Sequence, residues 1–249
     1  MKTYASFDAT TISYHELGAG PLVLLLHGFS GNAEINFLQP GIAEKVAAAG
    51  YRVIAPDLRG HGASPDETLP ENWPADAVAR DQIALIAHLG EAPFATVGYS
   101  MGAISALRFH LLSRNTGRLI LGGIGDSVAD EFNADRNTSF RAAILQALAG
   151  EDTPGAKAIR ARAAATGGSL RGYLGALSSR VYTPADLLAT FRVPTLILTG
   201  DKDLDNGSGP GLAALIPGAR YQPLTGTHIT AVIDPALPAA IIADLSGAG

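Results

Sequence analysis

The chain contains no cysteine among its 249 residues. This absence excludes disulfide bonds, thiolate metal ligands and a cysteine nucleophile. The six histidines are scattered along the chain and show none of the short spacings that are typical of a metal site. We therefore expect neither a bound metal nor a cofactor.

The chain also lacks an excess of positive charge and a long apolar segment. Its formal net charge is −5 and no run is rich in Lys or Arg, so we expect no nucleic-acid partner. The longest apolar runs, such as Leu22–Leu26, are far too short to cross a bilayer. Residues 1–8 lack the basic stretch and apolar core of a signal peptide. These features predict a soluble, cytoplasmic protein with no membrane partner.

Hydrophobic residues make up 47% of the chain, which is ample for a sizeable core. The length suits one large α/β domain or two small ones. The predicted strands cover residues 3–7, 11–16, 21–26, 51–55, 94–97, 118–123, 195–199 and 219–224, and the predicted helices cover 42–49, 75–89, 103–112 and 235–245. Strands that alternate with helices indicate βαβ units. The chain is therefore expected to have an α/β fold with a mostly parallel, doubly wound sheet.

The stretch between residues 123 and 195 interrupts this alternation, because it contains no convincing strand. Apolar residues within 140–148 and again within 170–177 follow the i, i+3, i+4, i+7 spacing of an amphipathic helix. This stretch is therefore predicted to be helical.

A helical insertion after strand 118–123 would lie over the crevice in which open parallel sheets bind ligands. We expect a small helical lid at residues 126–182, inserted into one integrated domain whose core comprises residues 1–125 and 183–249. Residues 155–180 carry five basic residues and no acidic one. This pattern favours a solvated helical face over a site for an anionic substrate or partner.

The sequence Gly98-Tyr99-Ser100-Met101-Gly102 lies between the strand at 94–97 and the helix at 103–112. A Gly-x-Ser-x-Gly motif in this position is the nucleophile-elbow signature. Its tight turn needs small residues beside the serine and lifts the hydroxyl clear of the sheet. We interpret Ser100 as a nucleophile rather than as part of an ordinary glycine-rich turn.

Five motifs that occur in a fixed order resemble the α/β-hydrolase superfamily from one end of the chain to the other. They are His27-Gly28-Phe29, DLRGHGAS at residues 57–64, the motif around Ser100, Gly200-Asp201-Lys202-Asp203 and Gly226-Thr227-His228. They are most similar to those of small-capped esterases, cofactor-free perhydrolases and C–C bond hydrolases. The resemblance implies the α/β-hydrolase fold, but it is a poor guide to substrate because this fold hosts many chemistries.

The resemblance also implies a catalytic triad in the order serine, acid, histidine. A serine hydroxyl needs an adjacent base that a carboxylate orients, and His228 after the last strand is the expected base. The fourth position of the Gly-x-x-Asp motif makes Asp203 the expected acid. Asp201 in the same loop and Asp126 after strand 118–123 stay open as alternatives.

By the same resemblance, the backbone N–H groups of Phe29 and Met101 are expected to form the oxyanion hole. Phe29, Tyr99 and Trp73 are candidates for the substrate pocket, although Trp73 could equally pack under the lid. Polar residues expected to support loops rather than chemistry are His27, Asp57, Arg59 and His61.

These features together predict a serine hydrolase that cleaves a carboxylic ester of a small-molecule acyl substrate. A lactonase or C–C bond hydrolase with the same triad, and a ligand receptor on a hydrolase fold, stay as alternatives. A serine nucleophile disfavours epoxide hydrolase chemistry, which in this superfamily implies an aspartate at the elbow. The sequence leaves the oligomeric state, including a homodimer, open.

Overall fold

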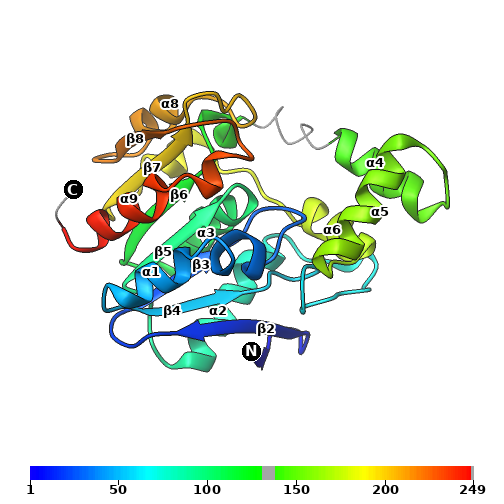
Figure 1. Cartoon of the computed structure of the whole chain (residues 1–249), viewed down its shortest axis with the longest axis horizontal. Helices are drawn as coiled ribbons and strands as arrows, with labels where there is room; N and C mark the ends of the chain where they lie inside the picture. Colours follow the sequence, from blue (N-terminus) through cyan, green and yellow to red (C-terminus); the bar gives the residue numbers. More distant parts are fainter. Residues whose placement is uncertain (131–137, 248–249) are drawn as a thin grey trace.

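The computed structural model describes residues 1–130 and 138–247 and is built on one eight-stranded sheet (Figure 1). The strand order is β1-β2-β4-β3-β5-β6-β7-β8. Strands β1, β2 and β4 pair antiparallel, and the remaining neighbours pair parallel. The strands are β1 Lys2–Ala5, β2 Thr11–Leu17, β3 Leu22–Leu26, β4 Arg52–Pro56, β5 Ala95–Tyr99, β6 Arg118–Gly122, β7 Thr195–Gly200 and β8 Arg220–Leu224.

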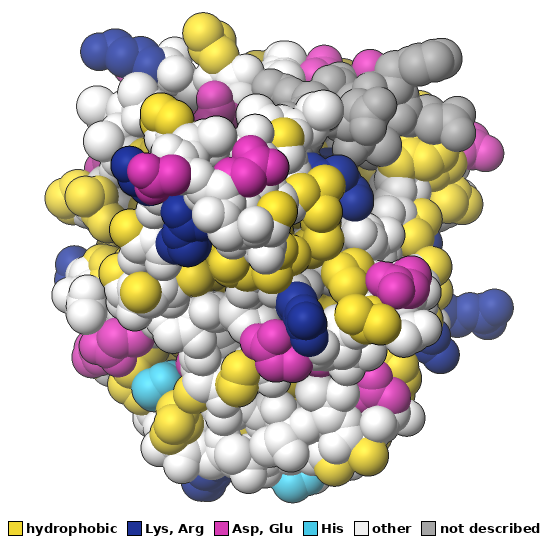
Figure 2. All heavy atoms as spheres, turned by 90° about the vertical axis from the view of Figure 1, so that its right-hand side faces the viewer, with side chains coloured by type: hydrophobic (Ala, Val, Ile, Leu, Met, Phe, Trp, Pro, Cys, Tyr) yellow, Lys and Arg dark blue, Asp and Glu magenta, His cyan; other side chains and the backbone are white. Residues whose placement is uncertain are grey.

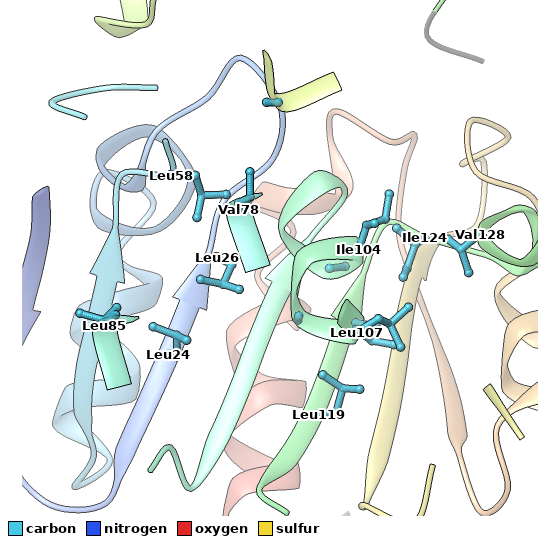
Figure 3. Close-up of a cluster of buried hydrophobic side chains, with 14 of the residues drawn as sticks. Leu24, Leu26, Leu58, Val78, Leu85, Ile104, Leu107, Leu119, Ile124 and Val128 are labelled. Carbon is cyan, nitrogen blue, oxygen red and sulfur yellow. The ribbon is translucent and has the colours of Figure 1, made fainter. Parts of the chain in front are cut away.

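Helices cover both faces of the sheet, as a doubly wound fold requires. Along β3, Leu24 and Leu26 point into the core under one face, whereas Val23 and Leu25 point into the core under the other. The first core contains side chains of α2, α3 and α8, and Figure 3 shows part of it. The second contains side chains of α1 and α9. The helices of these two layers are α1 Ile42–Ala48, α2 Ala77–Leu89, α3 Met101–Ser113, α8 Gly209–Leu215 and α9 Ala236–Leu245.

The predicted fold class is confirmed. All eight predicted strands and the four helices predicted outside the insertion are present, with ends that differ by a few residues. The sequence analysis did not predict α8 or the π-helix η1 (Glu34–Leu38). The remaining short helices are η2 Pro70–Asn72, η3 Asp126–Ala129, α7 Ala185–Leu188 and η5 Ala231–Ile233. None of the helices in the described part of the chain combines the length and the apolar character that a membrane crossing requires.

The three longest helices in the described part of the chain between β6 and β7 form what we call the helical insert: α4 Thr138–Leu148, α5 Pro154–Thr166 and α6 Leu170–Ser178. They pack around a small core of their own, which includes Ile144, Ile159 and Tyr173. The insert projects beyond the carboxyl ends of the parallel strands (Figure 1). Residues 131–137 of the expected lid lie outside the described residues, and its boundaries at 126 and 182 stay a prediction.

Candidate active site

Ser100 lies at the sharp turn between β5 and α3. Its backbone has φ 54° and ψ −117°, which is a strained conformation for a residue other than glycine. A Cβ atom at Gly98 would overlap the backbone of Gly102, and one at Gly102 would overlap the carbonyl oxygen of Leu26. The two glycines therefore allow α3 to start directly against the sheet, with Ser100 held at its first turn.

Ser100 is connected to His228 and Asp203 by two hydrogen bonds. His228 lies in the loop after β8, and its Nε2 is 3.0 Å from Oγ of Ser100. Its Nδ1 is 2.9 Å from Oδ2 of Asp203, which follows β7. Because an ionised carboxylate only accepts hydrogen bonds, Nδ1 carries the proton and Nε2 is free to accept from the serine hydroxyl. The Asp203 side chain is 3% exposed and the His228 side chain 14%, so water screens this chain of bonds little.

The two alternative acids have different partners. Oδ1 of Asp201 accepts a hydrogen bond from the N–H of Gly226 at 2.8 Å. Oδ1 of Asp126 accepts one from the N–H of Ser208, also at 2.8 Å. Asp201 therefore braces the loop that carries His228, and Asp126 braces the loop that carries Asp203. The structure brings Asp203, and neither of the others, to the histidine.

Two further side chains hold the loops of the site. The Tyr99 hydroxyl donates to the carbonyl oxygen of His228 at 2.7 Å. Burial raises the pKa of Tyr99 well above its ordinary value, and the nearby charge of Asp203 adds to this, so the hydroxyl keeps its proton. Nδ2 of Asn206 donates to the carbonyl oxygen of Gly123 at 2.9 Å and ties the acid loop to the end of β6. The sequence analysis missed Asn206, which carries no motif of its own.

The His27-Gly28-Phe29 turn lies directly beside the serine, since a Cβ atom at Gly28 would lie 3.5 Å from Cβ of Ser100. Oδ1 of Asn36 accepts from the Gly28 N–H at 2.8 Å and fixes the turn. Among the described residues, the N–H groups of Phe29 and Met101 donate to no acceptor. Both amides are therefore available to a ligand at the serine. Asn36 was missed because it lies on the unpredicted π-helix η1.

His27 supports this turn, as expected from the sequence. Its Nε2 accepts from the N–H of Leu58 at 2.9 Å, so Nδ1 carries the proton and donates to the Gly28 carbonyl oxygen at 2.8 Å. Burial lowers the pKa of His27 to about 4. The ring is therefore neutral at pH 7 and acts as a fixed connection between two loops.

The DLRGHGAS loop is a buried scaffold. The Asp57 carboxylate accepts from the N–H groups of Ala33 and Ala63, each at 2.8 Å. The Arg59 side chain is 2% exposed, and its Nε donates to Asp81 at 3.0 Å. Burial by itself lowers the pKa of Arg59, but its hydrogen bonds to carboxylates outweigh this and keep the pKa above its ordinary value. The loop therefore fixes the site without entering it.

A cavity of about 80 Å³ opens beside the serine. It is lined by Phe29, Asp76, Val78, Ala79, Ser100, Met101, Ile104, Ser105, Arg108, Ala176, Leu177, Ser179, Arg180, Val181 and Asn206. Hydrophobic side chains gather in a central band on the side of the molecule from which the insert projects, with charged side chains around them (Figure 2).

Two residues that were expected in the substrate pocket are absent from the lining of this cavity. Phe29 lines the cavity, but Tyr99 and Trp73 do not. The Tyr99 hydroxyl bonds instead to the backbone carbonyl oxygen of His228. Trp73 is 7% exposed and packs under α6, where a Cβ atom at Gly175 would overlap its ring. This is the alternative that the sequence left open for Trp73.

Among the described residues, Asp203, Asp205 and His228 form a group whose potential metal-ligand atoms lie within 4.8 Å of one another. However, both ring nitrogens of His228 already bond to Asp203 and Ser100. A metal ion at this position would have to break one of these bonds, so the hydrogen-bond geometry favours the serine site over a metal centre.

Comparison with known proteins gives a consistent picture of the fold. A family model described as the alpha/beta hydrolase fold matches residues 21–118. The non-heme haloperoxidase of Rhodococcus erythropolis is 28% identical over 237 residues, which cover 82% of each chain. The structure of an esterase from a Rhodococcus species is 26% identical, with a TM-score of 0.70 over 100% of this chain and 99% of that one. A thermophilic esterase of Thermogutta terrifontis gives a TM-score of 0.76 at 23% identity, over 99% and 98% of the two chains.

Some similarities are confined to one part of the chain. Epoxide hydrolase 3 of Siraitia grosvenorii is 37% identical over 95 residues, which cover 38% of this chain and 29% of that protein. The matched part spans about a third of the length of the first curated relatives.

Proposed function

The chain belongs to the α/β-hydrolase superfamily, and on this premise we propose that it is a serine hydrolase that cleaves a carboxylic ester through an acyl-enzyme. The observation that carries the proposal is the continuous pair of hydrogen bonds from Ser100 through His228 to Asp203. A serine hydroxyl becomes a nucleophile when a positioned imidazole accepts its proton.

In the proposed reaction, Nε2 of His228 takes the proton of Ser100 as Oγ attacks the ester carbonyl carbon. The N–H groups of Phe29 and Met101 bind the oxyanion that forms. His228 then gives its proton to the leaving alcohol, and the acyl group stays on Ser100. Water, deprotonated by His228, attacks the acyl-enzyme and releases the acid. Asp203 keeps the imidazole in the correct tautomer and stabilises its protonated form.

The size of the cavity supports a small acyl or alcohol group in the substrate. A water molecule needs about 10–15 Å³ of such space, so about 80 Å³ corresponds to a group of only a few heavy atoms. The helical insert supplies part of the wall through Ala176 and Leu177. We also propose that the insert is the lid of this site.

Hydrolysis of p-nitrophenyl esters of increasing chain length by wild type and Ser100→Ala tests the proposal. We expect turnover by the wild type with an optimum at short chains. The kcat of Ser100→Ala should fall by about four to six orders of magnitude, because the nucleophile is absent. Ser113→Ala, at the far end of α3, is the matched control and should retain full activity. Equal activity of Ser100→Ala and wild type would rule out the proposed nucleophile.

A second candidate reaction is favoured by two relatives that match most of the chain. One is named a putative non-heme chloroperoxidase and the other a non-heme haloperoxidase. Hydrogen peroxide in place of water would attack the same acyl-enzyme and release a peracid and free Ser100. Peracid formation with acetate and hydrogen peroxide, measured for wild type and Ser100→Ala, separates this reaction from ester hydrolysis alone.

A further inference from the structure

The cavity at the proposed active site runs along one face of α3. Met101, Ile104, Ser105 and Arg108 all line it, and their i, i+3, i+4, i+7 spacing puts them on the same side of the helix. Because an α-helix rises about 1.5 Å per residue, Met101 and Arg108 are about 10 Å apart along the axis. A ligand arm that starts at Ser100 can therefore reach a charged side chain.

Arg108 at this far end is held in one orientation by Asp76. Its Nε donates to Oδ1 of Asp76 at 2.8 Å, and its Nη2 donates to Oδ2 at 2.6 Å. The Arg108 side chain is 12% exposed and the Asp76 side chain 9%. Such a bidentate pair uses two of the five N–H donors of a guanidinium and both carboxylate oxygens. Three donors are left on the other edges of Arg108.

The backbone of Asp76 is adapted to this pairing. Asp76 lies at the N-cap of α2, where an aspartate side chain normally accepts from the first backbone N–H groups. Its side chain makes no such capping bond, and its backbone has φ 59°, a left-handed conformation that is unfavourable for a residue with a Cβ atom. Its own N–H donates to the carbonyl oxygen of Ser179 at 2.7 Å. The Asp76 side chain thus orients Arg108 in the cavity wall instead of stabilising the start of α2.

We propose that Arg108, oriented by Asp76, determines substrate specificity by binding a carboxylate at the far end of the cavity. This inference rests on the proposed function and names its substrate class: esters in which one arm ends in a carboxylate, such as half-esters of dicarboxylic acids. The free edge of a guanidinium matches the two oxygens of a carboxylate. A cationic arm would find both oxygens of Asp76 already occupied, and Arg180 adds a second basic residue to the lining.

The specificity test compares kcat/KM for p-nitrophenyl half-esters of dicarboxylic acids, from succinate to sebacate, with that for neutral esters of equal length. The double variant Asp76→Asn/Arg108→Gln removes both charges together, so neither is left alone in the wall. We expect the ratio of charged to neutral substrate to fall about tenfold to a hundredfold, as for the loss of hydrogen bonds to a charged group. Circular dichroism of both proteins checks that the double variant is folded.

Two further variants sharpen the comparison. Arg108→Lys keeps the charge but loses the planar edge, and it should show an intermediate ratio. Arg171→Gln removes an exposed basic residue of α6 that does not line the cavity, and its ratio should equal that of the wild type. An unchanged ratio in the double variant, or a preference of the wild type for ω-ammonium esters, would overturn the proposal.

Binding without turnover separates this proposal from the proposed function. Calorimetry with the monomethyl half-esters uses Ser100→Ala as the parent protein and adds the double substitution at residues 76 and 108. Weaker binding by about tenfold or more supports the carboxylate site even if the wild type hydrolyses no ester. Equal binding by both proteins rejects the site even if ester hydrolysis is found.

Discussion

Three aspartates follow strands near His228, and their hydrogen bonds give each a different role. Asp203 accepts from the imidazole, whereas Asp201 and Asp126 accept from backbone N–H groups of neighbouring loops. Oδ1 of Asp203 also accepts from the Asp205 N–H, but its Oδ2 bonds to the imidazole. A carboxylate without a bond to the imidazole can stabilise a loop but cannot fix the tautomer of the ring. The three residues are therefore expected to differ in their effects on catalysis.

Replacing Asp203 by Asn should lower kcat for ester hydrolysis by roughly 10⁴-fold, because an amide no longer enforces the Nδ1–H tautomer of His228. Asp201→Asn is the matched control: it keeps the size of the side chain and should change kcat by less than about tenfold. Steady-state kinetics on one p-nitrophenyl ester, with circular dichroism to verify folding, measures both. A larger loss for Asp201→Asn than for Asp203→Asn would show that the acid is misassigned.

Sequence patterns predicted the triad positions but not the residues around them. Ser100 and His228 stand in motifs with a fixed order, and Asp203 stands at a fixed position of its motif. Arg108 was missed, because an arginine on a helix is ordinarily solvated and only the packing of α3 against the cavity reveals its direction. The sequence analysis placed Tyr99 and Trp73 in the substrate pocket, although their side chains pack elsewhere. Tyr99 lies in the motif itself, but the sequence does not show on which side its ring or the ring of Trp73 packs.

At the scale of single elements, α6 connects the insert to the core through two glycines. A Cβ atom at Gly172 would overlap the backbone of Gly60, and one at Gly175 would overlap the ring of Trp73. Glycine within a helix costs about 1 kcal/mol relative to alanine. This cost is offset by the close approach of α6 to the DLRGHGAS loop and to Trp73, which places Ala176 and Leu177 in the wall of the cavity.

Gly175→Ala should therefore lower the free energy of unfolding by about 1–3 kcal/mol, since overpacking against Trp73 outweighs the gain in helix propensity. Arg171→Ala, on the exposed side of the same helix, should change it by less than about 0.5 kcal/mol. Urea unfolding of both variants, followed by tryptophan fluorescence, gives the comparison. Stabilisation by Gly175→Ala would mean that α6 does not pack closely on Trp73 in solution.

The helices of the insert differ in how clearly the sequence predicts them. Large apolar residues at helical spacing predicted α4 and α6. Helix α5 buries small side chains, among them Ala156 and Ala163, which give little periodic signal. The two ends of α5 give a clearer sequence signal than its interior does. Thr153 caps the start of the helix by accepting a hydrogen bond from the Ala156 N–H, and a proline follows it. Gly167 caps the end of the helix. The sequence analysis found no signal for the π-helix η1.

At the scale of the whole molecule, three buried histidines should set the response to acid. Burial lowers the pKa of His27 to about 4, that of His61 to about 3 and that of His110 to about 4. The rings of His27 and His61 contact each other, with centroids 5.3 Å apart, and His27 also bonds Leu58, whereas His110 bonds Thr96. All three are neutral in the folded protein at pH 7, and in the unfolded chain they take up protons near pH 6.5.

The direction of the pH effect follows from these values. A histidine whose pKa is lower in the folded state contributes its full stability above pH 6.5, and this contribution is lost as the pH falls toward the folded pKa. At pH 5 the contribution of each histidine to the free energy of unfolding has fallen by about 2 kcal/mol, since each pH unit below 6.5 removes about 1.4 kcal/mol. Asp8 titrates at lower pH, because its hydrogen bond to Arg59 lowers its pKa. Between pH 6.5 and 5 the loss therefore belongs to the histidines.

We accordingly expect the free energy of unfolding in urea to fall by several kcal/mol between pH 7.5 and 5.0, with unfolding accompanied by proton uptake. His110→Gln should reduce the number of protons taken up on unfolding by about one, because glutamine does not titrate. The free energy of unfolding should then depend less steeply on pH. If stability were constant over this range, the buried histidines would have to be protonated in the folded state. The Leu58 N–H would then face a protonated Nε2 of His27, and the turn that carries Phe29 could not keep its geometry.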